Sequence, residues 1–581
     1  MSLALYIAPD KFFIRDESSL SPSTPALVID RLNCDIECVI DADIPVISNR
    51  KSIHGLLGIV PLLSGPHLVV ITHKSKVGEI VHNHTIWKVE ATEIISFSRA
   101  NLHLTKEESE KNKVMMDMII QVLSTPAFYF CHTLDMTRNI QNRGNTDTKQ
   151  SLIQSADFEY VWNRKLLEPF FDRPELHRFC LPIIHGAIFI QRCSVNGKFF
   201  RWALISRRSS DRVGTRFFVR GVNHFGKVAN FVETEQIVEH DGAISSFVQS
   251  RGSIPMFWSQ LPTLEYMPKP SIMLGEDHQT GFDVHFGEQI NKYGDVVAVN
   301  LINTHGYEGK LEKSYRQLCS NSVKAPRISY EGFDFHAEGW SRISKLIDRL
   351  SSYQNKFNFF YYDSRQRTPN LVQSGIFRTN CMDCLDRTNV VQSMLAFENL
   401  KSVFSRMGIS NSGLELNTDF IKVFKNVWAD HADVIAVQYA GTRAMKTDFT
   451  RTGKRTYAGI LDDGYNALSR YVKNNFFDGF RQDSLDIFIG KIGTGLNARS
   501  FDSYPIFFHQ SEFKAVHIIP LSLLVIIASF FLILLFSSEI NSHTFLFLFF
   551  LACLIAILLM MLFRFGPQFV DWPKFNQFHL Q

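Results

Sequence analysis

The sequence predicts a mixed α+β or α/β protein, with a β-rich module packed on an α/β domain and a transmembrane hairpin near the C-terminal end. Three observations lead to this fold class. Residues 1–115 hold short apolar runs broken by turn residues, which is typical of a β-rich module. Residues 116–490 alternate strand-like runs with amphipathic patterns, which indicates a mixed α/β domain. Residues 515–563 hold two apolar runs that are each long enough to cross a bilayer.

The N-terminal module is predicted from strand-like segments that carry no reactive motif. Apolar and β-branched residues recur there in short runs with turn residues between them. The expected strands are Ala4–Ala8, Pro25–Ile29, Gly55–Val60 and Leu68–Ile71. A helical pattern from Thr105 to Val122 then leads into the α/β domain.

The α/β domain is predicted from strands that are followed by amphipathic helices. The expected strands are Leu181–Ile190, Phe199–Ile205 and Asp295–Ile302. The expected helices are Glu338–Leu350 and Thr388–Met407. Such a succession indicates a sheet covered by helices.

Two apolar runs, 515–536 and 544–563, predict a membrane hairpin. As helices each would extend over about 30 Å, the thickness of the hydrocarbon core of a bilayer. A short polar turn separates them, so both ends of the pair lie on one side of the membrane. A hairpin buried in a protein core is the alternative, and the uninterrupted apolar length disfavours it.

The charges around the hairpin predict its orientation. Lys514 precedes the pair, Arg564 and Lys574 follow it, and the turn contains no Lys or Arg. The positive-inside rule therefore places both termini in the cytosol. Residues 491–514 are then a juxtamembrane linker and residues 564–581 a cytosolic tail.

The composition excludes several classes of protein. The 61 basic and 57 acidic residues leave a net charge of +4, which gives no electrostatic reason to expect a nucleic-acid partner. Nine scattered cysteines form no paired framework and fit a reducing compartment. The first residues lack the pattern of a cleaved signal peptide.

The segment Arg378–Asn389 is the candidate active site. It contains Cys381 and, six positions later, Arg387. In a chain of this composition about 0.5 pairs with this spacing are expected by chance, so the spacing alone is weak evidence. Its context is more informative, because Leu371–Phe377 looks like a strand and a helical pattern begins just after Arg387. A loop between a strand and a helix N-terminus directs free backbone N–H groups at an anion.

This loop predicts a cysteine phosphatase with a Cys-x5-Arg phosphate loop. The helix N-terminus and Arg387 favour the thiolate form of Cys381, which is the nucleophile. The Arg387 guanidinium can pair with two phosphate oxygens, and the Thr388 hydroxyl can hydrogen-bond the sulfur. We expect in-line attack, a phosphocysteine intermediate and hydrolysis by water, with no metal or other cofactor.

The leaving alkoxide needs a proton, and the loop carries two carboxylates, Asp383 and Asp386, of which Asp383 is the expected general acid. Asp430 and Asp433 are alternatives from outside the loop. Asp383 could instead serve the turn by bonding to its backbone.

Cys384 forms a Cys-x-x-Cys pair with Cys381. Zinc would need a second pair, which the sequence does not offer at a suitable spacing, and a dithiol redox enzyme is a further alternative. We expect a more modest role for Cys384, a reversible disulfide with the oxidised nucleophile.

Residues Arg378–Asn389 closely resemble the signature of the Sac-domain (suppressor-of-actin) phosphoinositide phosphatases. Further segments resemble other blocks of that family: Ser206–Arg216, Asn230–Gln236, Arg251–Gln260, Phe333–His336 and Gln438–Arg455. With its terminal hairpin, the chain is similar to the integral-membrane type of the endoplasmic reticulum and Golgi. Its tail departs from some relatives because it lacks a C-terminal dilysine signal.

The resemblance implies a phosphatase for phosphatidylinositol 4-phosphate, and also 3-phosphate, at the cytosolic face of the endoplasmic reticulum membrane and possibly the Golgi. It implies that Cys381 is the nucleophile and Arg387 the phosphate-binding arginine. Membrane phosphoinositides and the bilayer are then its partners.

Basic clusters are expected to supply the positive charge that the acidic loop lacks. They are Arg207, Arg208, Arg212 and Arg216, and Lys446, Arg451, Lys454 and Arg455. They either attract lipid phosphates or belong to solvated or internally paired faces. The candidate substrate-binding residues are Asn380, Thr388, Lys446 and Arg451.

Two alternatives to the lipid phosphatase stay open. A catalytically weak phosphoinositide-binding scaffold would not need an intact Cys, Arg and Thr. A protein-tyrosine phosphatase would have His before the nucleophile and glycine inside the loop, where this chain has Asn380 and Met-Asp-Cys-Leu-Asp.

Overall fold

A large mixed sheet covered by helices forms the body of the protein. The computed structural model describes residues 3–17, 24–40, 42–46, 48–81, 83–98, 104–143, 150–339, 342–365, 369–410, 417–491, 515–536 and 541–575. The predicted mixed α/β fold is confirmed. The linker proposed at 491–514 lies outside these ranges apart from residue 491, as do residues 537–540 of the hairpin turn and 576–581 of the tail.

The N-terminal segment forms a five-stranded antiparallel sheet in the order β4-β3-β2-β1-β5. Its strands are β1 (Leu3–Ile7), β2 (Lys11–Asp16), β3 (Ala26–Asp30), β4 (Ile36–Val39) and β5 (Asn49–Ile53). Helix α1 (Lys106–Leu123) follows the module, and Thr105 and Glu108 cap it with a reciprocal pair of side-chain to backbone hydrogen bonds.

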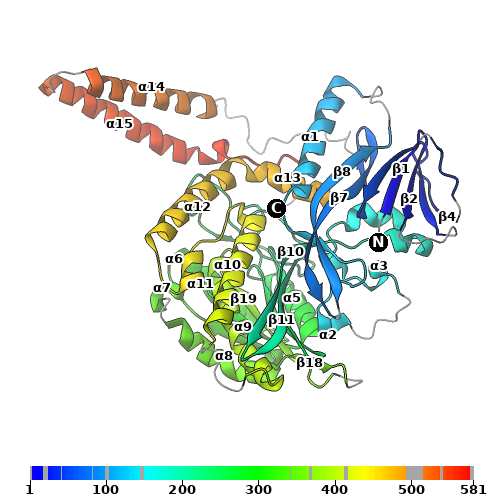
Figure 1. Cartoon of the computed structure of the whole chain (residues 1–581). Helices are drawn as coiled ribbons and strands as arrows, with labels where there is room; N and C mark the ends of the chain where they lie inside the picture. Colours follow the sequence, from blue (N-terminus) through cyan, green and yellow to red (C-terminus); the bar gives the residue numbers. More distant parts are fainter. Residues whose placement is uncertain are drawn as a thin grey trace.

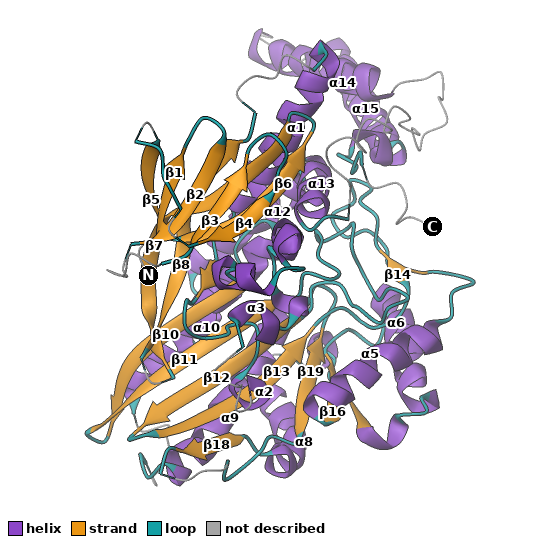
Figure 2. Cartoon of the chain, turned by 90° about the vertical axis from the view of Figure 1, so that its right-hand side faces the viewer, coloured by secondary structure: helices purple, strands orange, loops and turns teal. Residues whose placement is uncertain are grey.

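The large sheet has twelve strands and extends from the N-terminal region into the α/β region (Figure 2). Its order is β17-β16-β19-β13-β12-β11-β10-β9-β8-β7-β6, and β18 also pairs with β13. The strands are β6 (Gly55–Leu62), β7 (Gly65–Ile80), β8 (His84–Ser96), β9 (Phe128–Phe130), β10 (Ile184–Val195), β11 (Lys198–Arg208), β12 (Val232–His240), β13 (Ala243–Arg251), β16 (Asp295–Asn300), β17 (Ile328–Gly332), β18 (Phe360–Asp363) and β19 (Gly375–Asn380). Neighbours from β6 to β13 pair antiparallel, whereas β13, β19, β16 and β17 pair parallel.

Helices cover both faces of the parallel part of this sheet (Figures 1 and 2). Successive strand residues point to opposite faces: Val297 packs with α8, α9 and α10, and Val296 packs with α5 and α6. These helices are α5 (His278–Tyr293), α6 (Gly306–Asn321), α8 (Ile343–Phe357), α9 (Asp386–Arg406) and α10 (Thr418–Ala440). Shorter elements are α2 (Ile140–Arg143), α3 (Leu152–Ser155), α4 (Arg164–Leu167), α7 (Phe335–Glu338), α11 (Thr447–Thr452), β14 (Trp258–Ser259) and β15 (Ser271–Ile272).

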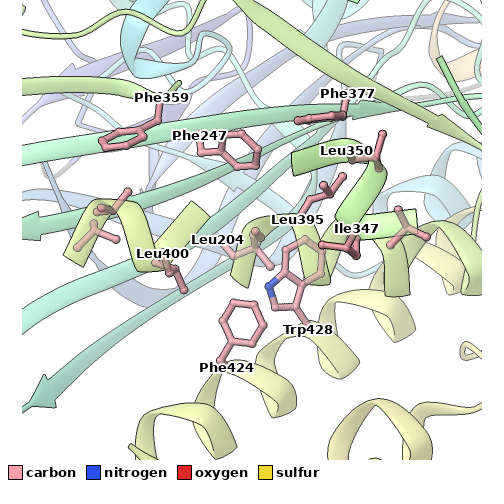
Figure 3. Close-up of a cluster of buried hydrophobic side chains, with 14 of the residues drawn as sticks. Leu204, Phe247, Ile347, Leu350, Phe359, Phe377, Leu395, Leu400, Phe424 and Trp428 are labelled. Carbon is pink, nitrogen blue, oxygen red and sulfur yellow. The ribbon is translucent and has the colours of Figure 1, made fainter. Parts of the chain in front are cut away.

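A buried apolar cluster fixes α9 beneath the candidate site (Figure 3). Leu395 and Leu400 of α9 lie there with Trp428 of α10, Leu350 of α8 and Phe377 of β19. Each of these side chains is fully buried. Removing one would cost about 2–5 kcal/mol, so the position of α9 is strongly determined.

The C-terminal hairpin consists of α14 (Ala515–Phe536) and α15 (Ser542–Arg564). Both are long and apolar enough to cross a membrane and are mostly exposed, which is compatible with membrane association (Figure 1). The chain then returns to the α/β domain. Asp571 accepts a hydrogen bond from the backbone of Phe480 in α13 (Asp478–Phe488), and Trp572 packs against Phe218.

Candidate active site

Residues 381–385 form a short loop between the end of β19 and the N-terminus of α9. β19 lies between β13 and β16, parallel to both, so the loop lies at the carboxyl edge of parallel strands, where ligands usually bind in α/β sheets. The predicted strand began four residues too early, because Leu371 makes only an isolated bridge to Tyr361. The predicted helix is confirmed and begins at Asp386.

The Cys381 thiol is poised to ionise near neutral pH. It is 5% exposed, and its pKa is lowered to about 6, first by a hydrogen bond from Cys384 and then by the charge of Arg387 and a hydrogen bond from Thr388. Burial and the Asp383 carboxylate oppose this shift. Cys381 is therefore largely a thiolate at pH 7, the form that acts as a nucleophile.

Arg387 extends from the first turn of α9 toward the loop after β16. Its Nη1 donates to the carbonyl oxygen of Leu301 at 2.9 Å and lies 3.4 Å from the Glu308 carboxylate of α6. These contacts hold the guanidinium at the rim of the same pocket that Cys381 lines.

Asp383 is held by two arginines that approach from the segment after β11. Arg216 donates through Nε at 3.0 Å, and Arg220 donates through Nη2 at 2.7 Å. Although burial favours the neutral carboxyl, these two guanidinium groups hold the pKa of Asp383 well below its usual range. Asp383 is thus ionised at neutral pH, which is not the starting state of a general acid.

Asp386, the other loop carboxylate, lies in the opposite electrostatic setting. Burial raises its pKa above the ordinary value, although Arg470 lies 3.9 Å away and the backbone N–H of Met445 donates to it at 2.8 Å. Asp386 lines the pocket with Cys381. Its surroundings therefore favour the protonated form that a general acid needs.

The two aspartates considered outside the loop lie away from this pocket. Asp430 pairs with Arg451 at 2.7 Å, and Asp433 accepts the backbone N–H of Ala444. Burial raises the pKa of Asp433 to about 6, but neither carboxylate is among the residues that line the pocket.

A cavity of about 240 Å³ opens above Cys381. Its lining combines basic, acidic and apolar side chains: Arg216, Phe217, Tyr266, Met267, Cys381, Met382, Asp383, Asp386, Arg387, Met445, Lys446, Ala467, Arg470, Tyr471 and Asn475. Its cations come from elements far apart in the sequence.

The four predicted substrate-binding residues occupy different positions. Lys446 lines the pocket, and Thr388 is fully buried and is one of the groups that lower the pKa of Cys381. Asn380 is fully buried and donates to Asn300 Oδ1 at 2.6 Å, a contact that supports the loop from below. Arg451 pairs with Asp430 and does not line the pocket.

The first basic cluster divides into structural and site residues. Arg207 is fully buried and donates to Glu233 at 3.0 Å and to Glu235 at 2.7 Å. It therefore belongs to an internally paired face, the alternative to attracting lipid phosphates. Arg216 reaches the pocket. The sequence analysis did not single out Arg220 and Arg470 as site residues. The only signal for them in the sequence is that they lie near the segments that resemble family blocks.

Two buried arginines lie behind the loop. Arg378 donates to the carbonyl oxygen of Gly252 at 3.0 Å, and Arg251 Nη2 lies 3.3 Å from His431 Nε2. Burial lowers the pKa of Arg251 to about 10, whereas the thiols of Cys381 and Cys384 raise it. Its positive charge lies close enough to favour a thiolate in the loop.

Cys384 has the features of a protected thiol. It is 1% exposed, its backbone has a φ of 54°, and its Sγ lies 2.9 Å from the carbonyl oxygen of Gly252. Burial raises its pKa well above the ordinary value. Among the described residues there is no cluster of three or more His, Cys, Asp or Glu that could hold a metal ion.

Comparison with known proteins finds strong similarity along the chain. Residues 54–339 match the SacI homology domain. The chain is 42% identical to phosphatidylinositol-3-phosphatase SAC1-A of Danio rerio, over 99% of this chain and 98% of that protein. It is 39% identical to phosphatidylinositol-3-phosphatase SAC1 of Drosophila melanogaster, over 98% and 96%. The protein of that name in Saccharomyces cerevisiae is 33% identical, over 92% and 87%.

Proposed function

Since this chain belongs to the family of Sac phosphoinositide phosphatases, we propose that it hydrolyses phosphatidylinositol monophosphates, chiefly the 4-phosphate and also the 3-phosphate, through a phosphocysteine on Cys381. One observation carries the mechanism: a thiol whose pKa is lowered to about 6 and an arginine line the same cavity. The relatives are named phosphatidylinositol-3-phosphatases, which supports activity on the 3-phosphate.

In the first step the Cys381 thiolate attacks phosphorus as the bond to the inositol oxygen breaks. Arg387 pairs with non-bridging oxygens and stabilises the charge that is redistributed over them. In the second step water attacks the phosphocysteine, the S–P bond breaks, and inorganic phosphate leaves the regenerated thiolate. Neither of these two steps requires a metal ion.

The inositol oxygen takes a proton as it leaves. Asp383 remains the residue that the loop sequence favoured, but its two arginine partners oppose protonation. Asp386 lines the same pocket with a raised pKa, so we assign it the general-acid role. Asp383 then has the task of holding Arg216 and Arg220 at the pocket.

The apolar hairpin supports action at a membrane surface. We propose that both termini lie in the cytosol and that the enzyme resides in the endoplasmic reticulum membrane, with a share in the Golgi. The basis is the charge distribution around the hairpin and the resemblance described above.

Purified full-length protein in vesicles provides the test. Phosphate release is measured from each phosphatidylinositol monophosphate, from the 4,5-bisphosphate and from a phosphotyrosine peptide, for the native chain and for Cys381→Ser. We expect release from the 4-phosphate and 3-phosphate that Cys381→Ser abolishes. Activity that persists in Cys381→Ser would refute the mechanism, and a preference for the peptide would refute the lipid assignment.

A further inference from the structure

Helix α12 (Tyr457–Phe476) is amphipathic in the reverse sense to an ordinary surface helix. Its buried side chains are polar or charged: Asn466, Arg470, Asn474 and Asn475. Seven large apolar side chains of the helix are exposed, namely Tyr457 (90%), Ile460 (51%), Leu461 (76%), Tyr465 (71%), Leu468 (65%), Val472 (37%) and Phe476 (41%). A surface helix normally buries its apolar face, so this arrangement requires an explanation.

The exposed side chains form one continuous face. At about 100° per residue, the seven apolar side chains occupy an arc of about 160°; Asp462 and Asp463 lie outside it, and the buried Asn475 falls within it at the C-terminal end of the helix. Over 20 residues the face is about 30 Å long. An exposed apolar patch of this length marks a surface that interacts with a membrane or with another protein.

The polar face of α12 attaches it rigidly to the catalytic domain. Arg470 donates to the Thr442 hydroxyl at 3.0 Å and to the carbonyl oxygen of Arg443 at 2.8 Å, and Asn474 donates to the carbonyl oxygen of Ala440 at 3.0 Å. These buried hydrogen bonds fix which face of the helix points outward.

The same helix forms one wall of the active-site cavity. Ala467 and Tyr471 of α12 line the cavity together with Cys381, and Tyr266 and Met267 line it from another segment. Tyr266 and Met267 are also exposed, by 62% and 73%. The opening above Cys381 is thus bordered by apolar side chains on two elements.

The end of the membrane hairpin lies beside this rim. Gly566, two residues after α15, packs so closely on Thr263 that an added Cβ would lie 2.1 Å from the Thr263 carbonyl oxygen. The Tyr471 hydroxyl of α12 donates to the neighbouring carbonyl oxygen of Leu264 at 2.8 Å. In Figure 1 the hairpin leaves the domain toward the upper left, and α12 lies on that side of the domain.

From these observations we propose that α12 is an interfacial helix, which inserts its exposed apolar face into the headgroup and upper acyl region of the leaflet that holds the substrate. The exposed Arg443 and Lys473 lie next to its polar side and suit an anionic surface. Insertion brings the cavity mouth to the headgroups, so that a phosphate reaches Cys381 while the acyl chains stay in the bilayer. This inference rests on the proposed lipid phosphatase activity.

The test uses full-length protein in vesicles of phosphatidylcholine with phosphatidylinositol 4-phosphate, and a water-soluble short-chain form of the same substrate. The double variant Leu461→Asp/Leu468→Asp is compared with Leu32→Asp, a matched change at an 87% exposed leucine in the turn between β3 and β4. We expect the double variant to lower hydrolysis of the vesicle lipid about tenfold or more. Hydrolysis of the soluble substrate stays within about twofold, and Leu32→Asp changes neither rate.

A second measurement reports insertion without activity. A fluorescent amino acid is introduced at position 468 or at position 32, and the vesicles contain lipids that carry a quencher on the acyl chain. We expect quenching at position 468 and none at position 32. Unchanged vesicle activity in the double variant, or equal quenching at the two positions, would overturn the proposal. If neither substrate is hydrolysed by the native chain, the proposed function fails, and the quenching result still decides on insertion.

Discussion

The substitution Cys384→Ala is expected to move the acid limb of the pH profile of this enzyme. The hydrogen bond from Cys384 is the largest of the contributions that lower the pKa of Cys381 to about 6. A hydrogen bond to a charged group contributes about 1.5–3 kcal/mol, which corresponds to about 1–2 pKa units. The Cys381 thiol in the variant should therefore ionise about 1–2 units higher.

The sign and size of the effect follow from the fraction of thiolate. Since Cys381 is nucleophilic only when deprotonated, the rate falls as the pH drops through its pKa. At pH 6 about half of the native thiol is ionised, against about 1–10% in the variant, a loss of about 5-fold to 50-fold. At pH 9 both proteins are almost fully ionised, so their rates should converge.

The assay is kcat/KM against pH between 5 and 9, with the water-soluble substrate, so that membrane binding does not contribute. Thr388→Val serves as a companion variant, because it removes the other hydrogen bond that lowers this pKa. An acid limb that stays at the native pH would refute the assigned cause. A uniform loss across the whole pH range would point to damaged geometry in place of a shifted pKa.

Three further outcomes are expected. Asp386→Asn should lower hydrolysis of phosphoinositides by about 10²–10³-fold. It should lower hydrolysis of p-nitrophenyl phosphate by less than about tenfold, because p-nitrophenolate leaves without a proton. Asp383→Asn should slow the hydrolysis of both substrates equally. After peroxide treatment the native enzyme should recover activity with a thiol reductant, whereas Cys384→Ala should lose it irreversibly, because Cys381 then lacks a neighbouring thiol with which its sulfenic acid can form a disulfide and water. Arg207→Met should lower the free energy of unfolding by about 3–5 kcal/mol, measured by thermal melting, because it removes the guanidinium group that pairs with two buried glutamates.

Each of these outcomes has a result that contradicts it. Equal losses on both substrates in Asp386→Asn would remove its role as acid. Irreversible loss in the native enzyme would exclude a protective disulfide. An unchanged melting temperature in Arg207→Met would mean that Glu233 and Glu235 are not stabilised by this pair.

Much of the local structure near the candidate site could be predicted from periodicity. Alternating and continuous apolar runs identified β1, β3, β6, β7, β10, β11 and β16, and the helical pattern after Arg387 identified α9. Strands such as β8 were missed because they carry many polar residues and gain their stability from neighbouring strands. The bounds of α14 matched the predicted apolar run, residues 515–536, because that run is uninterrupted in the sequence.

Sequence alone predicted Cys381 as the candidate nucleophile, the loop that carries it and the two apolar helices, because each prediction depends on residues that are close together in the chain. Tertiary structure decided the state of the two loop aspartates, since Arg216 and Arg220 reach Asp383 across more than 160 residues while burial acts on Asp386. It also decided which face of α12 points outward, because the hydrogen bonds of Arg470 and Asn474 to the end of α10 orient that helix. Electrostatic and packing contacts of this kind depend on distance in space, which the order of residues does not reveal.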